Sequence, residues 1–502
     1  MERGQKPGIS PTRAEDFPQW FQSVVRDAEV AELDHVRGAM VIRPWGYGIW
    51  ELMQRTLDDG IKETGAVNAY FPLFIPISYF EDEAKHVEGF AKEMAVVTHH
   101  RLEQGPDGGL VPAAELPEPL IVRPTSETII GRSFAKWINS YRDLPLLINQ
   151  WANIVRWEMR PRVLLRTTEF LWQEGHTAHA TEEEAREEMS RMLEVYREFA
   201  EQALAIPVIP GEKPESERFP GAETSLTIEA MMQDGKALQS GTSHYQGQNF
   251  SRAMDMEFTD EDGQQKLCHT TSWGVTTRLV GAVVMTHGDD DGLRMPPAVA
   301  PNQVVIVPIT RDDPTPVLEG CRELADELGK AKALKAPLRV HLDDRDRKPA
   351  DKRWEWIRKG APIVIELGGR DLDQGVVTVT RRDDPQLSRK ALPRAEAKKA
   401  IPKALGEIQK GYLKEASARL KDRTTTKVKD VDQFRQWFSG ERTEDGGFVR
   451  APWSEDPDTA KVMGELGVTV RCIPFDQKLA ANAKCVISGG PAKVEAIFAK
   501  AY

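Results

Sequence analysis

Residues 154–179 read Ile-Val-Arg-Trp-Glu-Met-Arg-Pro-Arg-Val-Leu-Leu-Arg-Thr-Thr-Glu-Phe-Leu-Trp-Gln-Glu-Gly-His-Thr-Ala-His. The alternation of polar and apolar residues predicts two short strands joined by a loop. Arg156 and Glu158 fall on the first strand, Pro161 marks the turn, and residues 166–173 form the return. The stretch therefore predicts part of an antiparallel sheet that carries unusually many charges among apolar neighbours.

The same stretch combines several arginines with three aromatic rings, Trp157, Phe170 and Trp172. Arginine forks bind phosphate and carboxylate groups, and aromatic faces stack on purine rings. A hairpin with one solvated face would also alternate polar and apolar residues. By itself the stretch leaves both interpretations open.

Length and composition are those of an ordinary globular protein. The 502 residues are enough for about three domains of roughly 150 residues each, with 40% hydrophobic and 29% charged residues. The net charge of −11 means that nucleic-acid binding would require a local basic surface. Because the N-terminus lacks an apolar signal core and no segment approaches 18 apolar residues, we expect a cytoplasmic protein that does not bind membranes.

Several common site signatures are missing. The cysteines lie far apart without a Cys-x-x-Cys pair, which argues against a disulfide framework and a four-thiolate zinc site. His99–His100 and the pair His176 and His179 have no third metal ligand at a recognisable spacing. Neither GxxxxGK[ST] nor a GxGxxG that follows a strand is present, so a P-loop and a dinucleotide fold are not supported.

The N-terminal part combines helices with a strand that proline interrupts. Helical spacing of apolar residues covers residues 15–37 and 47–64, and residues 67–76 form an apolar strand broken at Pro72. Because proline cannot donate to a ladder, this strand lies at a sheet edge or against another chain. An edge strand is the commoner arrangement, and a dimer seam is the alternative.

Polar residues mark the starts of two further helices. Thr125 or Ser126 is expected to cap a helix that follows the strand at residues 120–124. Thr181 and Glu184 have the spacing of a capping box and predict a long helix after them.

The rest of the chain changes from antiparallel to parallel patterns. Residues 223–274 predict antiparallel strands with hairpin turns at two Asp-Gly pairs, followed by an apolar helix that carries Arg278. Residues 302–400 alternate short apolar strands with helices, which predicts a small α/β domain with a mostly parallel sheet. The basic residues 381–427 have helical spacing and form either a basic face or a solvated linker helix.

Four strings together resemble one protein family. They are Arg123-Pro-Thr-Ser-Glu-Thr, Thr168-Glu-Phe-Leu-Trp-Gln-Glu-Gly-His, Gln239-Ser-Gly-Thr-Ser-His and Ser272-Trp-Gly-Val-Thr-Thr-Arg. With the antiparallel sheet and the arginine of the closing helix, they resemble class II aminoacyl-tRNA synthetases. The strings themselves look like prolyl-tRNA synthetases of the archaeal and eukaryotic type, and the resemblance covers essentially the whole chain.

The resemblance implies an α+β fold built from three parts. We expect an antiparallel-sheet class II catalytic domain at residues 1–301, an α/β anticodon-binding domain at 302–400, and a linker helix with a small mixed α/β C-terminal module at 401–502. The three class II motifs are then expected at about 44–76, 154–176 and 272–294.

The family's activity is the two-step ligation of proline to tRNA. ATP activates L-proline to prolyl-adenylate with release of pyrophosphate, and the terminal ribose of tRNA(Pro) then takes the prolyl group. Arg156 and Arg278 are the catalytic residues that the resemblance implies, because a guanidinium can bridge oxyanions as charge develops at phosphorus. The resemblance also implies a homodimer, Mg²⁺ that arrives with the phosphates, and no DNA partner.

The resemblance assigns the substrates residue by residue. The residues expected to bind ATP are Arg156, Glu158, Arg166, Thr167, Phe170, Gln239, Thr242, Thr276 and Arg278. The residues expected to bind proline are Thr125, Glu127, Arg156, Trp172, His176 and His244, with Glu174 beside them. Adenine would stack between Phe170 and Arg278, and Glu127 would take the secondary ammonium of proline.

Polar residues near strand ends of the α/β domain are candidate contacts for the tRNA anticodon. They are Arg345, Lys348, Glu366, Arg370 and Arg382. The alternative for each is a solvated surface charge.

The chain departs from the family at the C-terminal module. Relatives of this type often hold zinc with four cysteines there, whereas here Cys485 remains and Ser488 occupies the next ligand position. We therefore predict no structural zinc, and a module held by its own core. The span from Gly175 to Cys268 also has no room for the large editing insertion of the bacterial type.

Two other interpretations stay open on sequence grounds. A sibling class II synthetase for threonine, serine or histidine would share Arg-x-Glu but lack the Thr-Ser-Glu and Gly-Thr-Ser-His strings. A synthetase-like regulatory or tRNA-binding protein without catalysis would have lost Arg156 or Arg278, and both are present.

Overall fold

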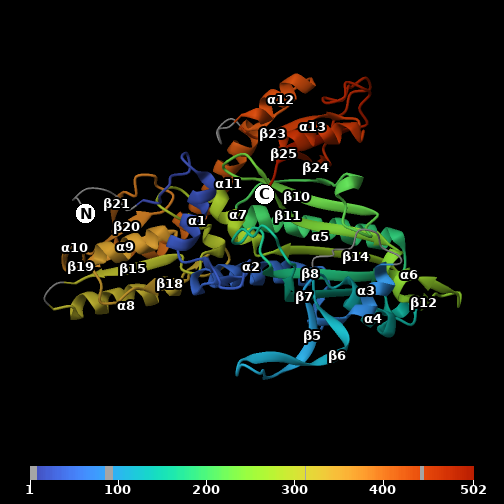
Figure 1. The fold of residues 1–502 in the computed structure, drawn as a ribbon. Coiled ribbons are helices and arrows are strands. Elements are labelled where there is room, and N and C mark those ends of the chain that lie inside the picture. Colours follow the sequence, from blue (N-terminus) through green and yellow to red (C-terminus); the bar gives the residue numbers. More distant parts are fainter. Residues whose placement is uncertain (1–7, 85–93, 311–312, 441–445) are drawn as a thin grey trace.

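A computed structural model describes residues 8–84, 94–310, 313–440 and 446–502. Figure 1 shows a large central sheet with helices against it, a smaller α/β unit on the left, and a C-terminal unit above. A long two-stranded arm projects below the central sheet. No described helix is long and apolar enough to cross a membrane.

The central sheet has eleven strands, most of them antiparallel, as the sequence predicts. Its order is β22 (Thr424–Thr425), β23 (Phe448–Trp453), β25 (Val494–Lys500), β24 (Val468–Pro474), β9 (Val208–Glu212), β10 (Thr224–Met231), β11 (Ala237–Gly247), β14 (His269–Thr276), β8 (Glu169–His179), β7 (Leu146–Val155) and β3 (Val67–Asn68). The pairs β3–β7 and β22–β23 are parallel.

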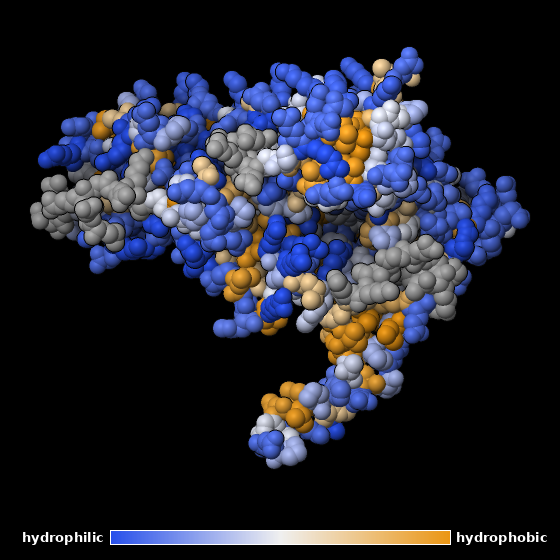
Figure 2. All heavy atoms as spheres, turned by 45° about the horizontal axis from the view of Figure 1, so that its top comes forward, coloured by the Kyte–Doolittle hydropathy of each residue, from blue (hydrophilic) through white to orange (hydrophobic). Residues whose placement is uncertain are grey.

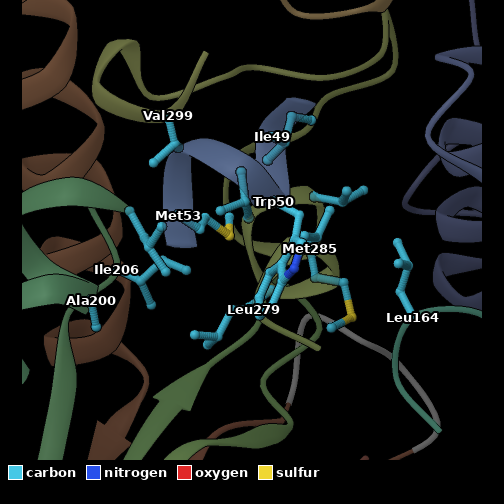
Figure 3. Packing of buried hydrophobic residues seen from close by; sticks show 14 of the residues in the cluster. Ile49, Trp50, Met53, Leu164, Ala200, Ile206, Leu279, Met285 and Val299 are labelled. Atoms are coloured by element: carbon cyan, nitrogen blue, oxygen red, sulfur yellow. The ribbon is translucent and has the colours of Figure 1, made fainter. Parts of the chain in front are cut away.

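Helices cover one face of this sheet. Helix α5 (Glu182–Glu198) packs across β10, β11 and β14 and continues into a π-helical turn, η2 (Phe199–Ala203). Helices α1 (Phe17–Asp27), α2 (Pro44–Glu63) and α7 (Arg278–His287) complete this layer, whose buried side chains interlock (Figure 3). Trp50 of α2 and Met285 of α7, both labelled in Figure 3, belong to this one buried cluster, so segments far apart in the sequence share one core.

Smaller elements surround the central sheet. They are β1 (Ala31–Leu33), β2 (Met40–Ile42), α3 (Ile77–Ala84), α4 (Glu127–Trp137), η1 (Tyr141–Asp143), η3 (Glu215–Glu217), α6 (Asn249–Met254), β12 (Glu257–Thr259), β13 (Gln265–Leu267) and η4 (Pro297–Val299). Strands β4 (Phe74–Pro76), β6 (Leu110–Val122) and β5 (Val96–Gln104) form a separate sheet that includes the projecting arm. Figure 2 shows hydrophobic residues gathered on this arm.

The sequence placed several element boundaries wrongly. Strand pairing in the predicted hairpin ends at Val155 opposite Glu169, so Arg156 and Glu158 lie in the connecting loop and not on a strand. Arg156 N donates to Thr168 O at 2.8 Å, which closes this loop. The first helix ends at Asp27 because Glu29 takes a left-handed conformation with φ of 57°.

The predicted caps had different outcomes. Thr181 and Glu184 form the expected capping box of α5. Neither Thr125 nor Ser126 caps α4: Ser126 takes the N-cap position without a side-chain hydrogen bond to the helix. Both hydroxyls instead donate to carboxylates, that of Thr125 to Glu127 and that of Ser126 to Glu174.

The α/β unit has a mixed sheet, not the mostly parallel one predicted. Its order is β18 (Val340–Leu342), β15 (Val304–Ile309), β19 (Ile363–Gly368), β20 (Val376–Arg381) and β21 (Arg389–Pro393). The β15 ladders are parallel, and the ladders from β19 to β21 are antiparallel. Its other elements are α8 (Thr315–Gly329), β16 (Lys332–Ala333), β17 (Ala336–Pro337), α9 (Pro349–Arg358) and α10 (Gly369–Gln374).

The C-terminal part begins with the long basic helix α11 (Arg394–Asp422), followed by α12 (Val431–Ser439) and α13 (Asp458–Leu466). Buried residues of this part form their own cluster, including Phe434, Trp453 and Phe498. In addition, β24 pairs with β9 through Ile473 opposite Glu212. The module therefore extends the central sheet, which the sequence pattern did not reveal.

Candidate active site

A cavity of about 530 Å³ opens on the face of the central sheet opposite α5. Strand alternation creates it: on β8, Trp172, Glu174 and His176 face the cavity, while Gln173 accepts a hydrogen bond from Tyr196 of α5 at 2.6 Å. On β11, Thr242 faces the cavity and its neighbour Ser243 donates to Met189 O of α5. The period-two pattern thus separates the site from the apolar core.

The cavity brings together every residue predicted for proline and ATP. They are Thr125, Glu127, Arg156, Glu158, Arg166, Thr167, Phe170, Trp172, Glu174, His176, Gln239, Thr242, His244, Thr276 and Arg278. These side chains come from the start of α4, the loop after β7, strands β8, β11 and β14, and the start of α7.

One end of the cavity is a corner of buried carboxylates. Glu127 is 7% exposed and Glu174 is 2% exposed. Glu174 accepts hydrogen bonds from Ser126 Oγ at 2.5 Å and Gln150 Nε2 at 2.8 Å, and His176 Nε2 lies 2.9 Å from its second oxygen. Burial by itself would lower the pKa of His176, but the hydrogen bond and charge of Glu174 raise it.

Arg156 lies between this corner and the rest of the cavity. Its Nε donates to Pro124 O at 2.9 Å. Its guanidinium carbon is 5.7 Å from the ring centroids of both Phe170 and Trp172. The side chain is exposed toward the cavity, so a planar, permanently charged donor group faces the space beside Glu127 and Glu174.

The opposite end contains arginines and an aromatic ring. Arg166 donates to Glu158 at 2.5 Å, and Phe170 packs edge-on against Trp172. Arg278 begins α7 and its Nε donates to Leu165 O at 3.1 Å. Burial and the nearby charge of Arg156 lower the pKa of Arg278 to about 10, so its guanidinium remains charged at neutral pH.

His244 closes the floor beside residues that the sequence did not suggest. Its Nδ1 lies 2.8 Å from Ser225 Oγ, its Nε2 lies 3.1 Å from Thr242 Oγ1, and Phe219 packs on its ring at 5.0 Å. Burial, and then the charge of Lys213, lower the pKa of His244 to about 3, which keeps it neutral. Ser225, Phe219 and Lys213 also line the cavity. Lys213 follows β9, Phe219 lies in the loop before β10, and Ser225 is on β10; no sequence motif marks any of them.

Comparisons with known proteins agree with this geometry. A family profile described as tRNA synthetase class II core domain (G, H, P, S and T) matches residues 113–287, an anticodon binding domain matches 303–404, and a prolyl-tRNA synthetase C-terminal domain matches 440–502. A proline–tRNA ligase from Protochlamydia amoebophila (strain UWE25) is 54% identical over 506 residues, covering 99% of each chain. One from Paramagnetospirillum magneticum (strain ATCC 700264 / AMB-1) is 55% identical over 504 residues, covering 100% of each. This chain belongs to the proline–tRNA ligase family.

A solved structure supports the same assignment. The crystal structure of prolyl-tRNA synthetase from Cryptosporidium parvum, complexed with halofuginone and AMPPNP, superposes with a TM-score of 0.87 at 39% identity and 99% coverage of both chains. The predicted fold class and the predicted family are therefore confirmed. The sibling-synthetase interpretation is not supported, because the full-length relatives are ligases for proline.

The candidate anticodon residues of this proline–tRNA ligase family member fall into two groups. Lys348, Arg370 and Arg345 are exposed, although Arg345 also pairs with Asp343 at 2.7 Å. Glu366 and Arg382 are buried, contrary to the expectation of polar surface contacts.

Glu366 forms an ion pair with Arg389, whose Nε lies 2.8 Å from a Glu366 carboxylate oxygen. Arg382 donates to Ile357 O and to both carboxylate oxygens of Asp289, in the loop after α7. Arg382 therefore joins the α/β unit to the loop after α7 and does not present its charge at the surface.

The last residue of the chain reaches the site. Tyr502 lines the cavity, its hydroxyl donates to Asp234 at 2.6 Å, and its backbone N donates to Ala237 O at 3.1 Å. Burial and the neighbouring Asp234 carboxylate raise the pKa of Tyr502. The C-terminal strand is thereby fixed against β11.

Histidines and cysteines take hydrogen-bonding and packing positions. In the described ranges, no three or more His, Cys, Asp or Glu side chains form a group that could hold a metal ion. His179 Nε2 lies 2.8 Å from Thr177 Oγ1. Cys485 Sγ accepts from Ser488 N at 3.4 Å, and Ser454 Oγ lies 3.3 Å from Ser488 Oγ, so two hydroxyls stand near the one thiol.

Proposed function

We propose that this protein is a proline–tRNA ligase that forms prolyl-adenylate from L-proline and ATP and then charges tRNA(Pro). One observation carries the proposal: Arg156 stands between the Glu127–Glu174 corner and the Phe170–Arg278 end of a single cavity. An amino-acid ammonium fits the corner and a purine fits the other end. The carboxylate of proline and the α-phosphate of ATP would then meet at the guanidinium of Arg156.

The carboxylate corner suits proline. Its secondary ammonium has two N–H donors, which Glu127 and the hydroxyl of Thr125 can take. The apolar pyrrolidine ring would lie against Trp172 and the neutral ring of His244, with His176 and Glu174 holding the wall in place. Because His244 is uncharged, it adds no positive charge beside the ammonium.

The opposite end suits ATP. Phe170 and Arg278 would cover the two faces of adenine, and Glu158, Arg166 and Thr167 line the space around it. Gln239, Thr242 and Thr276 offer amide and hydroxyl oxygens on the floor. Among the described residues no three or more His, Cys, Asp or Glu side chains form a group that could hold a metal ion. The neutral oxygens on the floor would accompany a Mg²⁺ ion that is held mainly by the phosphates and neutralises their charge.

The chemistry requires no covalent intermediate on the protein. A carboxylate oxygen of proline attacks the α-phosphorus, and the bond to pyrophosphate breaks. Arg156 and Arg278 would stabilise the charge that develops, and the fixed positions of the substrates supply the rest of the rate. A ribose hydroxyl of tRNA then attacks the acyl carbonyl, and AMP leaves.

The other parts are assigned on the same basis. We place the catalytic domain at residues 1–301, the anticodon-binding domain at 302–400, with Arg345, Lys348 and Arg370 as exposed candidate contacts, and the linker helix with the C-terminal module at 401–502. We expect the protein to act in the cytoplasm.

We also propose a homodimer. Val67, Tyr70 and Phe74, around the proline-broken strand, are 57%, 70% and 47% exposed, and Leu102 and Leu110 on the projecting arm are 61% and 73% exposed. A surface this apolar is typical of an interface. Sedimentation equilibrium should give twice the mass of 56.3 kDa, and Tyr70→Glu should reduce it to the monomer mass. A wild-type monomer mass at micromolar concentration would contradict the dimer.

Transfer of labelled proline to tRNA tests the whole reaction. Purified protein with ATP, Mg²⁺, labelled proline and tRNA(Pro) should produce acid-precipitable prolyl-tRNA. tRNA(Thr) should not be charged. Charging of no tRNA by a folded protein that still binds tRNA would favour the non-catalytic interpretation.

A further inference from the structure

Three charged residues form a buried cluster below the cavity floor. Glu229 is fully buried, Lys213 is 4% exposed and Arg471 is 7% exposed. Glu229 Oε1 accepts from Lys213 Nζ at 3.0 Å and from Thr227 Oγ1 at 3.0 Å. Its other oxygen accepts from Arg471 Nε and Nη2, each at 3.0 Å.

The fold directs this cluster toward the substrates. Glu229 shares a face of β10 with Ser225, which lines the cavity, and pairs in register with Gln239 of β11. Lys213 follows β9 directly and itself lines the cavity. Arg471 comes from β24 of the C-terminal module, next to the β24–β9 pairing. The C-terminal module therefore contacts the floor of the cavity through the carboxylate of Glu229.

The charges of the cluster do not balance. Two cations share one carboxylate, so the buried group carries one net positive charge, which is costly to keep away from water. The nearby Glu212 is engaged by Arg218 at 3.2 Å. An ion pair between Arg471 and Glu229 would be enough to join the C-terminal module to the sheet. Lys213 is the second cation, and it is the one that lines the cavity.

Lys213 also has donors to spare. An ammonium group has three N–H donors. Across residues 8–84, 94–310, 313–440 and 446–502, Glu229 is the one hydrogen-bond acceptor of Lys213 Nζ. The remaining donors are available to an anionic group in the cavity, beside Gln239 and Thr242.

We propose that Lys213 binds the phosphate groups of ATP, and that Glu229 and Arg471 are positioning residues that hold its ammonium at the floor. The C-terminal module thereby takes part in substrate binding. This inference rests on the proposed function, since it concerns the same ATP site.

The test compares binding of ATP with binding of adenosine, which lacks phosphates. Lys213→Met should weaken ATP binding about tenfold in calorimetry and change adenosine binding less than twofold. Arg471→Met should weaken ATP binding about fivefold, and Arg471→Lys should return it to within twofold of wild type. The matched control is Arg450→Met, which removes another ion-paired arginine of the same module, one bound to Glu495 at 2.8 Å and outside the cavity.

The double variant separates positioning from an independent effect. If Arg471 acts through Lys213, the Lys213→Met/Arg471→Met protein should bind ATP no more weakly than Lys213→Met alone. Fully additive losses would overturn the positioning role. Wild-type ATP affinity in Lys213→Met, or equal losses for ATP and adenosine, would overturn the phosphate assignment. Because binding is measured without proline or tRNA, absence of ligase activity in the wild type would refute the proposed function separately.

Discussion

Replacing Arg156 with alanine should abolish adenylate formation without unfolding the protein. The substitution removes one hydrogen bond to Pro124 O and two cation–π contacts at 5.7 Å. For a side chain exposed to the cavity, these contribute roughly 1–3 kcal/mol to stability. Loss of one preorganised donor at a developing oxyanion costs about 10²–10³-fold in kcat. Because this guanidinium would serve both the proline carboxylate and the α-phosphate, we expect a loss of at least about 10³-fold.

The assay is proline-dependent exchange of pyrophosphate into ATP, with Arg160→Ala as the control. Arg160 is an exposed arginine of the same loop that does not line the cavity. Its replacement should leave exchange within about twofold of wild type. Binding of tRNA should persist in Arg156→Ala, because the matched anticodon-binding region begins at residue 303. Exchange by Arg156→Ala within tenfold of wild type, in a folded protein, would refute the reasoning.

Other parts of the structure give four further predictions. Glu127→Gln should raise the KM for proline at least tenfold in the exchange assay, and a change confined to ATP would contradict the pocket assignment. Arg382→Met leaves the Asp289 carboxylate without its partner, so denaturant titration should show a loss of about 3–5 kcal/mol, and a loss under 1 kcal/mol would contradict the buried pair. Burial lowers the pKa of His287 to about 3, so below pH 6.5 the unfolded chain binds a proton that the folded chain excludes. Stability should thus fall by about 2 kcal/mol from pH 6.5 to 5, less so in His287→Asn, and identical pH curves would exclude this role. Metal analysis should find no zinc at Cys485, and one equivalent of bound zinc would contradict that prediction.

Much of the catalytic fold could be predicted because its patterns are local. Strand alternation, two Asp-Gly turns and the capping box of α5 are each defined within a few residues. The site residues were predicted from a resemblance between short strings, and the fold then places those strings around one cavity. The alternation continues past Val155 and so predicts a strand at Arg156, although backbone pairing ends at Val155.

The rest depended on contacts between distant segments. Nothing near Arg471 in the sequence indicates that its partner is Glu229, 242 residues away. Arg382 is polar and follows a strand, which predicts a surface contact. In the fold it is buried, and it pairs with Asp289 in the loop after α7. The hydroxyls of Thr125 and Ser126 match a helix cap locally. Thr125 instead donates to Glu127, two residues away, and the carboxylate of Glu174 that accepts from Ser126 becomes visible only when β8 is in place.

Amino-acid-dependent pyrophosphate exchange by the wild-type protein tests the central claim most directly. The structure places Glu127, Arg156 and Arg278 around one cavity, so proline alone should support exchange with ATP. Threonine, serine and histidine should give no more than background. Exchange with one of these amino acids and none with proline, in a folded protein, would contradict the account.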